Sequence, residues 1–148
     1  MQLTTMLLGA VVAAGIIAAP TPAPADAKSM MANVAQWTIE GMVRTCNAAD
    51  TSCKWSFNIA THTANPTPCQ YTVTGKPASH ASTNGVHCGG FTISSGWSGQ
   101  FGPGNGFTTL AVVDNSKKLI VWPAYTDKQL ANGVVVTPNQ SYAPVTLG

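Results

Sequence analysis

The chain has 148 residues, of which 45% are apolar and 8% are charged, and it contains 14 glycines and 10 prolines. Because an average soluble domain carries roughly 25% charged residues, this composition predicts one domain with a neutral, turn-rich surface and excludes a disordered chain. The formal net charge is +2 and no basic cluster exists beyond Lys117 and Lys118, which argues against nucleic acid as a partner.

The first 27 residues are predicted to be a signal peptide followed by a short pro-segment. Residues 7–19 form an apolar run that ends in small residues and is too short for a typical membrane span, as in a secretory leader. The proline-rich stretch 20–24 would end any helix there. A-x-A patterns end at Ala25 and Ala27, and Ala19 is a further candidate, so we expect cleavage between residues 19 and 27. We therefore expect residues 28–148 to be a single secreted, extracellular β domain with no membrane span.

Two strands joined by a polar loop open the predicted domain. Apolar and polar residues alternate along residues 37–43 and again along residues 53–59, and the loop between them predicts a hairpin. Cys46 falls on the opposite side of its strand from Trp37 and Val43. A bulge, or the end of the strand, must therefore turn Cys46 if it is to meet Cys53.

The middle of the chain continues in short segments. Residues 69–73 predict a third strand, and residues 75–84 predict a long polar loop that leads into an Asn-Gly turn at 84–85. Residues 86–94 predict one strand that is interrupted by a bulge or bend at the Gly-Gly pair 89–90.

The next segments are a glycine-rich loop and two apolar strands. Residues 96–106 contain five glycines and predict an irregular loop around Trp97 and Phe101. Residues 107–113 and 119–122 are nearly continuous apolar runs, which predict central strands buried on both faces.

A short helix and a final strand complete the prediction. Thr126 and Gln129 fit a capping box, the helix should end at Asn132–Gly133, and residues 134–136 predict the last strand. About seven short strands with turn signals between them predict an all-β fold, a small antiparallel β-barrel or sandwich with one short helix.

Four cysteines in a secreted chain of this size predict two disulfides. We expect Cys46 to pair with Cys53, which closes the first hairpin, and Cys69 to pair with Cys88, which joins two strands across the loop 75–84. The chain has no CxxC motif, and none of its three histidines has zinc-finger spacing. No metal site is therefore expected.

The titratable residues predict no active site. Most acidic residues after the leader fall in turns or in the first turn of the predicted helix, where a carboxylate has a local structural role; Glu40 is the exception. A secreted ribonuclease could combine His87 with Glu40 and Arg44 as acid, base and phosphate clamp, but solvated side chains explain these residues better. The chain lacks a G-x-S-x-G elbow, a phosphate-binding loop and an evident carboxylate pair, so we expect no catalytic residues, no cofactor and no enzyme activity.

Aromatic residues divide into core and surface candidates. Three tryptophans fall on apolar strand faces and are predicted core residues: Trp37, Trp55 and Trp122. Trp97 is predicted to lie in a loop with Phe101 close by, which makes these two residues the candidates for surface recognition, for example of a sugar. Asn139-Gln140-Ser141 is an acceptor pattern for N-glycosylation.

Three features of the sequence are specific when taken together: residues 37–53, the order of the four cysteines, and residues 96–132, which read GWSGQFGPGNGFTTLAVVDNSKKLIVWPAYTDKQLAN. They resemble a family of small secreted fungal proteins that includes elicitors of the plant hypersensitive response, notably the rice-blast hypersensitive-response-inducing type. The resemblance implies an extracellular virulence factor with a compact β-barrel-like fold, detected by a plant apoplastic or plasma-membrane component. It implies no catalytic residues.

Composition and spacing leave two other interpretations open. A small carbohydrate-binding protein of the fungal wall is indicated by Trp97 and the polar loops. A small secreted hydrolase is indicated by His87, Glu40 and Arg44.

Overall fold

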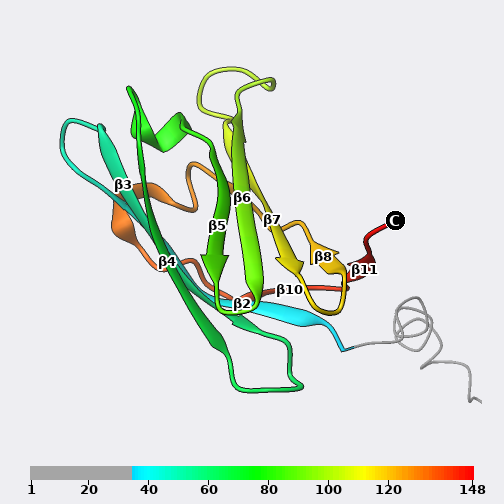
Figure 1. Cartoon of the computed structure of the whole chain (residues 1–148). Helices are drawn as coiled ribbons and strands as arrows, with labels where there is room; N and C mark the ends of the chain where they lie inside the picture. Colours follow the sequence, from blue (N-terminus) through cyan, green and yellow to red (C-terminus); the bar gives the residue numbers. More distant parts are fainter. Residues whose placement is uncertain (1–34) are drawn as a thin grey trace, which may run out of the picture. The chain divides into compact units, whose positions relative to one another are not determined.

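A computed structural model describes residues 35–148, which belong to one compact unit. The predicted leader and its cleavage region, residues 1–27, lie outside the described residues. The described part of the chain is all-β (Figure 1). Its strands are β2 (Trp37–Cys46), β3 (Ser52–Ala60), β4 (Thr67–Thr74), β5 (Thr83–Cys88), β6 (Phe91–Ser98), β7 (Phe107–Asp114), β8 (Leu119–Val121), β9 (Ala124–Thr126), β10 (Gln140–Tyr142) and β11 (Val145–Thr146). None of the helical segments within residues 35–148 has the length and apolar character needed to cross a membrane.

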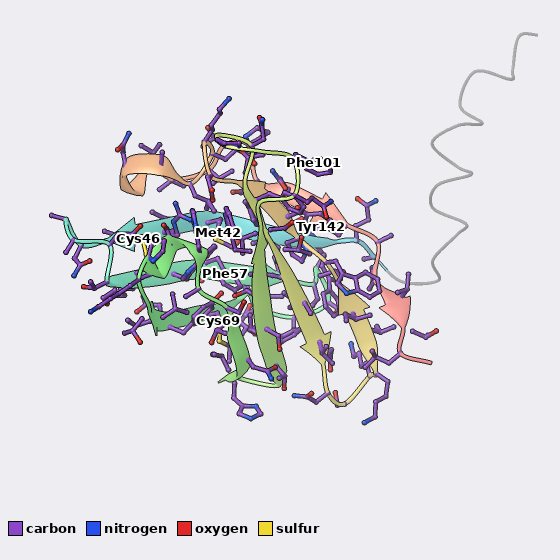
Figure 2. All side chains as sticks on the ribbon, turned by 90° about the horizontal axis from the view of Figure 1, so that it is seen from above. Met42, Cys46, Phe57, Cys69, Phe101 and Tyr142 are labelled. Carbon is purple, nitrogen blue, oxygen red and sulfur yellow. A yellow bond between two sulfur atoms is a disulfide. The ribbon has the colours of Figure 1, made fainter. Side chains whose placement is uncertain are left out.

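The strands form two antiparallel sheets. The first sheet has the order β10-β2-β3-β4, and the second has the order β11-β8-β7-β6-β5 with β9 paired to β7. The sheets do not close into a barrel, so the sandwich is the alternative that the structure realises. Side chains from both sheets fill one apolar core, which includes Met42 and Phe57 (Figure 2). Trp37 and Phe91 meet there edge to face, with ring centroids 5.6 Å apart.

A β-bulge in β2 decides which of its residues face the core. The register with β3 shifts between Glu40 and Val43, and Gly41 has a φ of +63° that favours glycine. Trp37 and Ile39 are buried before the bulge, and Met42 and Arg44 are buried after it. The extra residue therefore turns Cys46 toward Cys53, and it moves Val43 off the core face on which the sequence had placed it.

Two disulfides fasten the fold, with the same pairing that the sequence predicts. Cys46 and Cys53 are register partners at the end of the β2–β3 hairpin. Cys69 on β4 is joined to Cys88 on β5, so this bond links one sheet to the other. By the chain-entropy model, loops of 7 and 19 residues are worth about 2 and about 3 kcal/mol respectively.

The structure exchanges the turn and the bulge that the sequence predicts at the pairs Asn84–Gly85 and Gly89–Gly90. Gly89–Gly90 is the two-residue turn of the β5–β6 hairpin, because Cys88 and Phe91 are register partners, and Gly89 has a φ of +57°. The Asn84–Gly85 pair instead forms a bulge inside β5, where the register shifts between Thr83 and Val86. Both sites suit glycine, and sequence alone does not say which one reverses the chain.

The predicted helix is only a turn. The capping box forms, since Gln129 N donates to Thr126 Oγ1 at 3.1 Å and Thr126 N donates to Gln129 Oε1 at 2.8 Å. The chain then makes one 3₁₀ segment, η4 (Ala131–Gly133), which contains two residues with positive φ. So short a segment cannot offset the cost of helix nucleation.

The predicted last strand, residues 134–136, is also wrong. Val134 and Val135 are 59% and 47% exposed. Val136 N donates one hydrogen bond to Met42 O at 2.8 Å, but no ladder forms beside the β2 bulge. The last strands of the chain are β10 and β11.

Candidate functional site

Trp122 lies on the surface and not in the core, which corrects the sequence prediction. It follows β8 directly and is 52% exposed. The run Leu119–Trp122 is entirely apolar, which predicted a strand buried on both faces. The structure covers one face of this sheet with the core and leaves much of the other face open, as alternate residues of β7 are buried and half-exposed. Trp122 falls on the open face.

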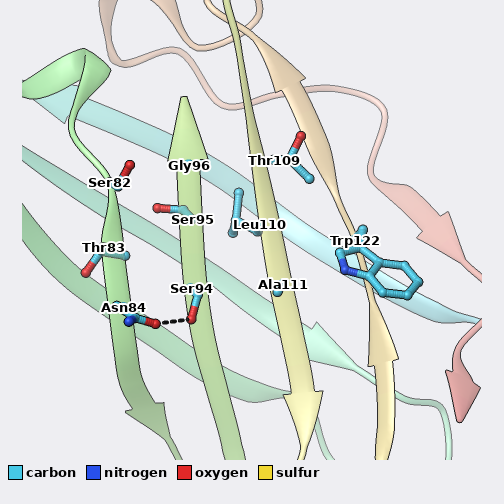
Figure 3. Close-up of a pocket in the computed structure, with 10 residues that line it drawn as sticks. All are labelled: Ser82, Thr83, Asn84, Ser94, Ser95, Gly96, Thr109, Leu110, Ala111 and Trp122. Atoms are coloured by element: carbon cyan, nitrogen blue, oxygen red, sulfur yellow. Dashed lines mark hydrogen bonds between the residues drawn. The ribbon is translucent and has the colours of Figure 1, made fainter. Parts of the chain in front are cut away.

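A shallow groove of about 510 Å³ runs beside Trp122 over the outer face of the second sheet. Figure 3 shows the indole at one side of the groove and Asn84, Thr83 and Ser82 at the other, with Ser94 and Ala111 between them. The groove therefore crosses β5, β6, β7 and the end of β8.

Small outward-facing residues create this groove. Ser94 pairs with Ala111 across β6 and β7, and Gly96 pairs with Thr109. A Cβ added at Gly96 would meet no heavy atom closer than Ser82 Oγ, at 3.9 Å. The floor is low because side chains in the middle strands are short, while Trp122 at one edge is tall.

Hydrogen bonds hold the polar wall of the groove in place. Ser94 Oγ donates to Asn84 Oδ1 at 2.9 Å, and Gly85 N donates to Ser94 Oγ at 3.5 Å. The β5 bulge thus fixes the carboxamide of Asn84 through its oxygen. The Nδ2 group of Asn84 has no acceptor among residues 35–148.

Trp97 is not the free loop ring that the sequence predicts. It lies near the end of β6 and is partly buried. Its ring stacks on His80 with centroids 3.6 Å apart and planes 7° apart, and its Nε1 donates to Asp127 Oδ2 at 2.9 Å. A Cβ at Gly106 would lie 2.5 Å from Asp127 Oδ2 and 2.6 Å from the indole, so the glycine-rich loop packs tightly on this pair.

Arg44 is buried and belongs to the same cluster. Its NH1 group lies 3.5 Å from Asp127 Oδ1 and donates to Ser79 O at 3.3 Å, and the guanidinium lies 5.8 Å from the centre of the Trp55 ring. A buried cation needs such partners to offset its lost hydration. Arg44 therefore ties β2 to the segments that carry Ser79 and Asp127.

Asp50 fastens the loop that follows β4. Both carboxylate oxygens accept hydrogen bonds from Ser79, from its N at 2.8 Å and from its Oγ at 2.5 Å. The Ser79 hydroxyl is the largest influence that lowers the pKa of Asp50 below its ordinary value of 3.8. Asp50 also lies 3.6 Å from Cys53 Sγ. The ligand atoms of three residues lie close enough together to hold a metal ion: Cys46, Asp50 and Cys53. Both sulfurs belong to a disulfide, however, and therefore offer no thiolate to a metal.

The structure does not assemble the ribonuclease hypothesis from His87, Glu40 and Arg44. His87 is exposed on β5, where its Nδ1 lies 3.4 Å from Thr92 Oγ1, and Glu40 lies on β2 of the other sheet. Arg44 instead meets Asp127, and His80 Nε2 lies 3.8 Å from Asp127 Oδ2. Sequence reasoning missed this group, because residues 44, 80 and 127 come together only through the fold.

Phe101 and Asn139 both lie on the surface. Phe101 is 65% exposed and stacks on Phe107 at 5.7 Å, beside a hollow of about 320 Å³ that also touches Tyr125. Asn139 is exposed and precedes β10; its Oδ1 accepts a hydrogen bond from Gly41 N at 3.0 Å. Asn139 therefore fixes the β2 bulge through its oxygen, while its nitrogen is the atom a glycan would use.

The fold defines a class of protein, the small β-sandwich held by disulfides. Its exposed aromatic rings, Phe101 and Trp122, lie on the surface. The family model described as "Effector TSP1" matches residues 38–147. A curated relative named "Effector TSP1", from Hypocrea virens (strain Gv29-8 / FGSC 10586), is 58% identical over 149 residues, which cover 99% of this chain and 99% of the relative. The chain belongs to the effector TSP1 family, a family of fungal effectors, which confirms the resemblance to a fungal effector family.

Proposed function

We propose that the protein is a secreted fungal effector that plant cells detect in the apoplast through its folded surface, and that it contributes to virulence by eliciting a defence response such as the hypersensitive response. The observation that carries the proposal is the match to an effector over almost the whole chain. The two disulfides support an extracellular site of action, because such bonds persist in oxidising compartments.

We further propose that the response does not require catalysis. Three acidic residues already have structural partners: Asp50 holds Ser79, Asp114 accepts from the N atoms of Ser116 and Lys117, and Asp127 meets Arg44 and Trp97. Carboxylates occupied in this way are poor candidates for a general base. Recognition of a surface needs a stable shape, which the disulfides help to supply.

A variant without histidine tests this proposal. It combines Glu40→Gln with His62→Asn, His80→Phe and His87→Ala, so that it keeps a ring stacked on Trp97 and a residue that tolerates the positive φ of position 62. Infiltrated into leaf tissue after near-UV circular dichroism has verified its fold, it should cause the same necrosis and oxidative burst as the wild type. A folded variant that is silent would bring catalysis back and contradict the proposal.

A further inference from the structure

The groove beside Trp122 combines one exposed indole with a set of uncharged hydrogen-bonding groups. None of the ten residues that line it carries a charge. We propose that this groove binds an uncharged, β-linked oligosaccharide, with Trp122 as its stacking platform. Saccharide binding at this place does not depend on the plant response proposed above.

The indole supplies the apolar part of the interaction. A pyranose ring with equatorial substituents has a flat face of C–H bonds, which packs well against an aromatic ring. Trp122 is 52% exposed, so it has such a face available to a ligand in the groove. Phe101 is also exposed, but it is paired with Phe107 and its hollow is lined mainly by apolar surface.

The polar wall supplies the groups that would orient a sugar. Ser94 is held by Asn84 and Gly85, which positions the Asn84 Nδ2 group as a donor without a protein acceptor among residues 35–148. The hydroxyls of Ser82, Thr83 and Thr109 line the same groove. A few fixed polar groups that converge beside an apolar surface are typical of small-molecule sites, and amides and hydroxyls match the hydroxyls of a sugar.

The dimensions of the groove favour an oligosaccharide over a single sugar. Three strand spacings separate β5 from β8, about 14 Å at about 4.8 Å for each step, which exceeds the length of one pyranose ring. The volume of about 510 Å³ also lies within the roughly 300–1,000 Å³ that is usual for ligand sites.

The lack of charge argues against two other classes of ligand. Nucleic acid needs cationic groups to neutralise phosphates, and an acidic polysaccharide such as polygalacturonate needs them as well. A protein partner could use Trp122 as an anchor, but it would gain little from a low floor of Gly96 and Ala111 flanked by the hydroxyls of Ser82 and Thr83.

The test is isothermal titration calorimetry of the oxidised protein, as purified after secretion, with cellohexaose, chitohexaose and laminarihexaose, and with polygalacturonate as the charged comparison. The three neutral probes distinguish a plant-wall from a fungal-wall source. Trp122→Ala removes the platform, and Gly96→Val fills the groove at an open strand position without positive φ. Phe101→Ala is the matched control, because it removes an exposed ring outside the groove, 65% exposed against 52% for Trp122.

At least one neutral probe should bind the wild type and Phe101→Ala equally well. Both Trp122→Ala and Gly96→Val should weaken binding by about tenfold or more, the order of effect that loss of one ring-stacking contact has in other aromatic platforms. The proposal is overturned if no neutral probe binds, if polygalacturonate binds best, or if Trp122→Ala binds like Phe101→Ala. It is also overturned if Gly96→Val leaves saccharide binding unchanged. The two proposals are tested separately: calorimetry of Trp122→Ala measures saccharide binding, and leaf infiltration of the same variant measures elicitation.

Discussion

Replacing Trp55 by alanine should cost the protein a large share of its stability. Trp55 is 2% exposed and stacks on Tyr71 with ring centroids 6.2 Å apart. A buried aromatic ring covers roughly 150–250 Å², which corresponds to about 4–6 kcal/mol at about 25 cal/mol for each Å². This agrees with the roughly 3–5 kcal/mol that large-to-small substitutions of aromatic core residues usually cost.

Trp122→Ala is the matched control for this substitution. The ring of Trp122 is 52% exposed, so about half of the same area is covered and the loss should not exceed about 2–3 kcal/mol. Urea unfolding of both oxidised variants, followed by tryptophan fluorescence with equal m values, measures the difference. Equal losses for Trp55→Ala and Trp122→Ala would refute the placement of one ring in the core and the other on the outer face.

Three further predictions concern the loops and the disulfides. Gly106→Ala should lower the free energy of unfolding by about 1–3 kcal/mol through overpacking, because the new Cβ would lie 2.5 Å from Asp127 Oδ2 and 2.6 Å from the Trp97 ring. Gly90→Ala is the control, since a Cβ there would meet nothing within 4 Å, and thermal melts of the two variants that coincide would contradict this prediction. Because the pKa of Asp50 is lowered in the folded state, its carboxylate contributes stability at pH values above 3.8, and this contribution disappears as the pH falls through the lowered pKa. The difference in free energy of unfolding between wild type and Asp50→Asn, measured across this pH range, should therefore shrink in acid. A difference that stays constant with pH would count against the hydrogen bonds from Ser79. Replacing Cys69 and Cys88 by serine should cost about 3 kcal/mol and replacing Cys46 and Cys53 about 2 kcal/mol, because the closed loops span 19 and 7 residues; denaturant titration would expose the opposite order.

The parts of the fold that were predictable from sequence rest on local patterns. Alternation of period two located β2, β3 and β4, since each has one face in the core. The position of Cys46 relative to Trp37 also required a bulge, and the structure has one at Gly41. The capping box at Thr126 formed as well, because its bonds involve residues only three apart.

The features that were not predictable depend on which layer covers which face. The run Leu119–Trp122 is apolar throughout, and only the packing of the second sheet decides that Trp122 faces outward. Trp97 was assigned to a loop because glycines follow it, but β6 extends to Ser98 and the ring finds His80 and Asp127. Contacts between residues so far apart in the chain leave no local signal. The exposed tryptophan was therefore expected at position 97, whereas the structure has it at Trp122.

The most direct test of recognition through a folded surface is leaf infiltration of the oxidised protein beside the same protein after reduction and alkylation. Opening both disulfides leaves every other side chain chemically unchanged but removes the disulfide between β2 and β3 and the disulfide between the two sheets. Backbone that opens locally as a result is exposed to proteolysis. We predict necrosis and an oxidative burst with the oxidised protein and neither response with the alkylated one. An undiminished response to the alkylated chain, after near-UV circular dichroism has verified that it is unfolded, would contradict the account, because a linear segment would then suffice for detection.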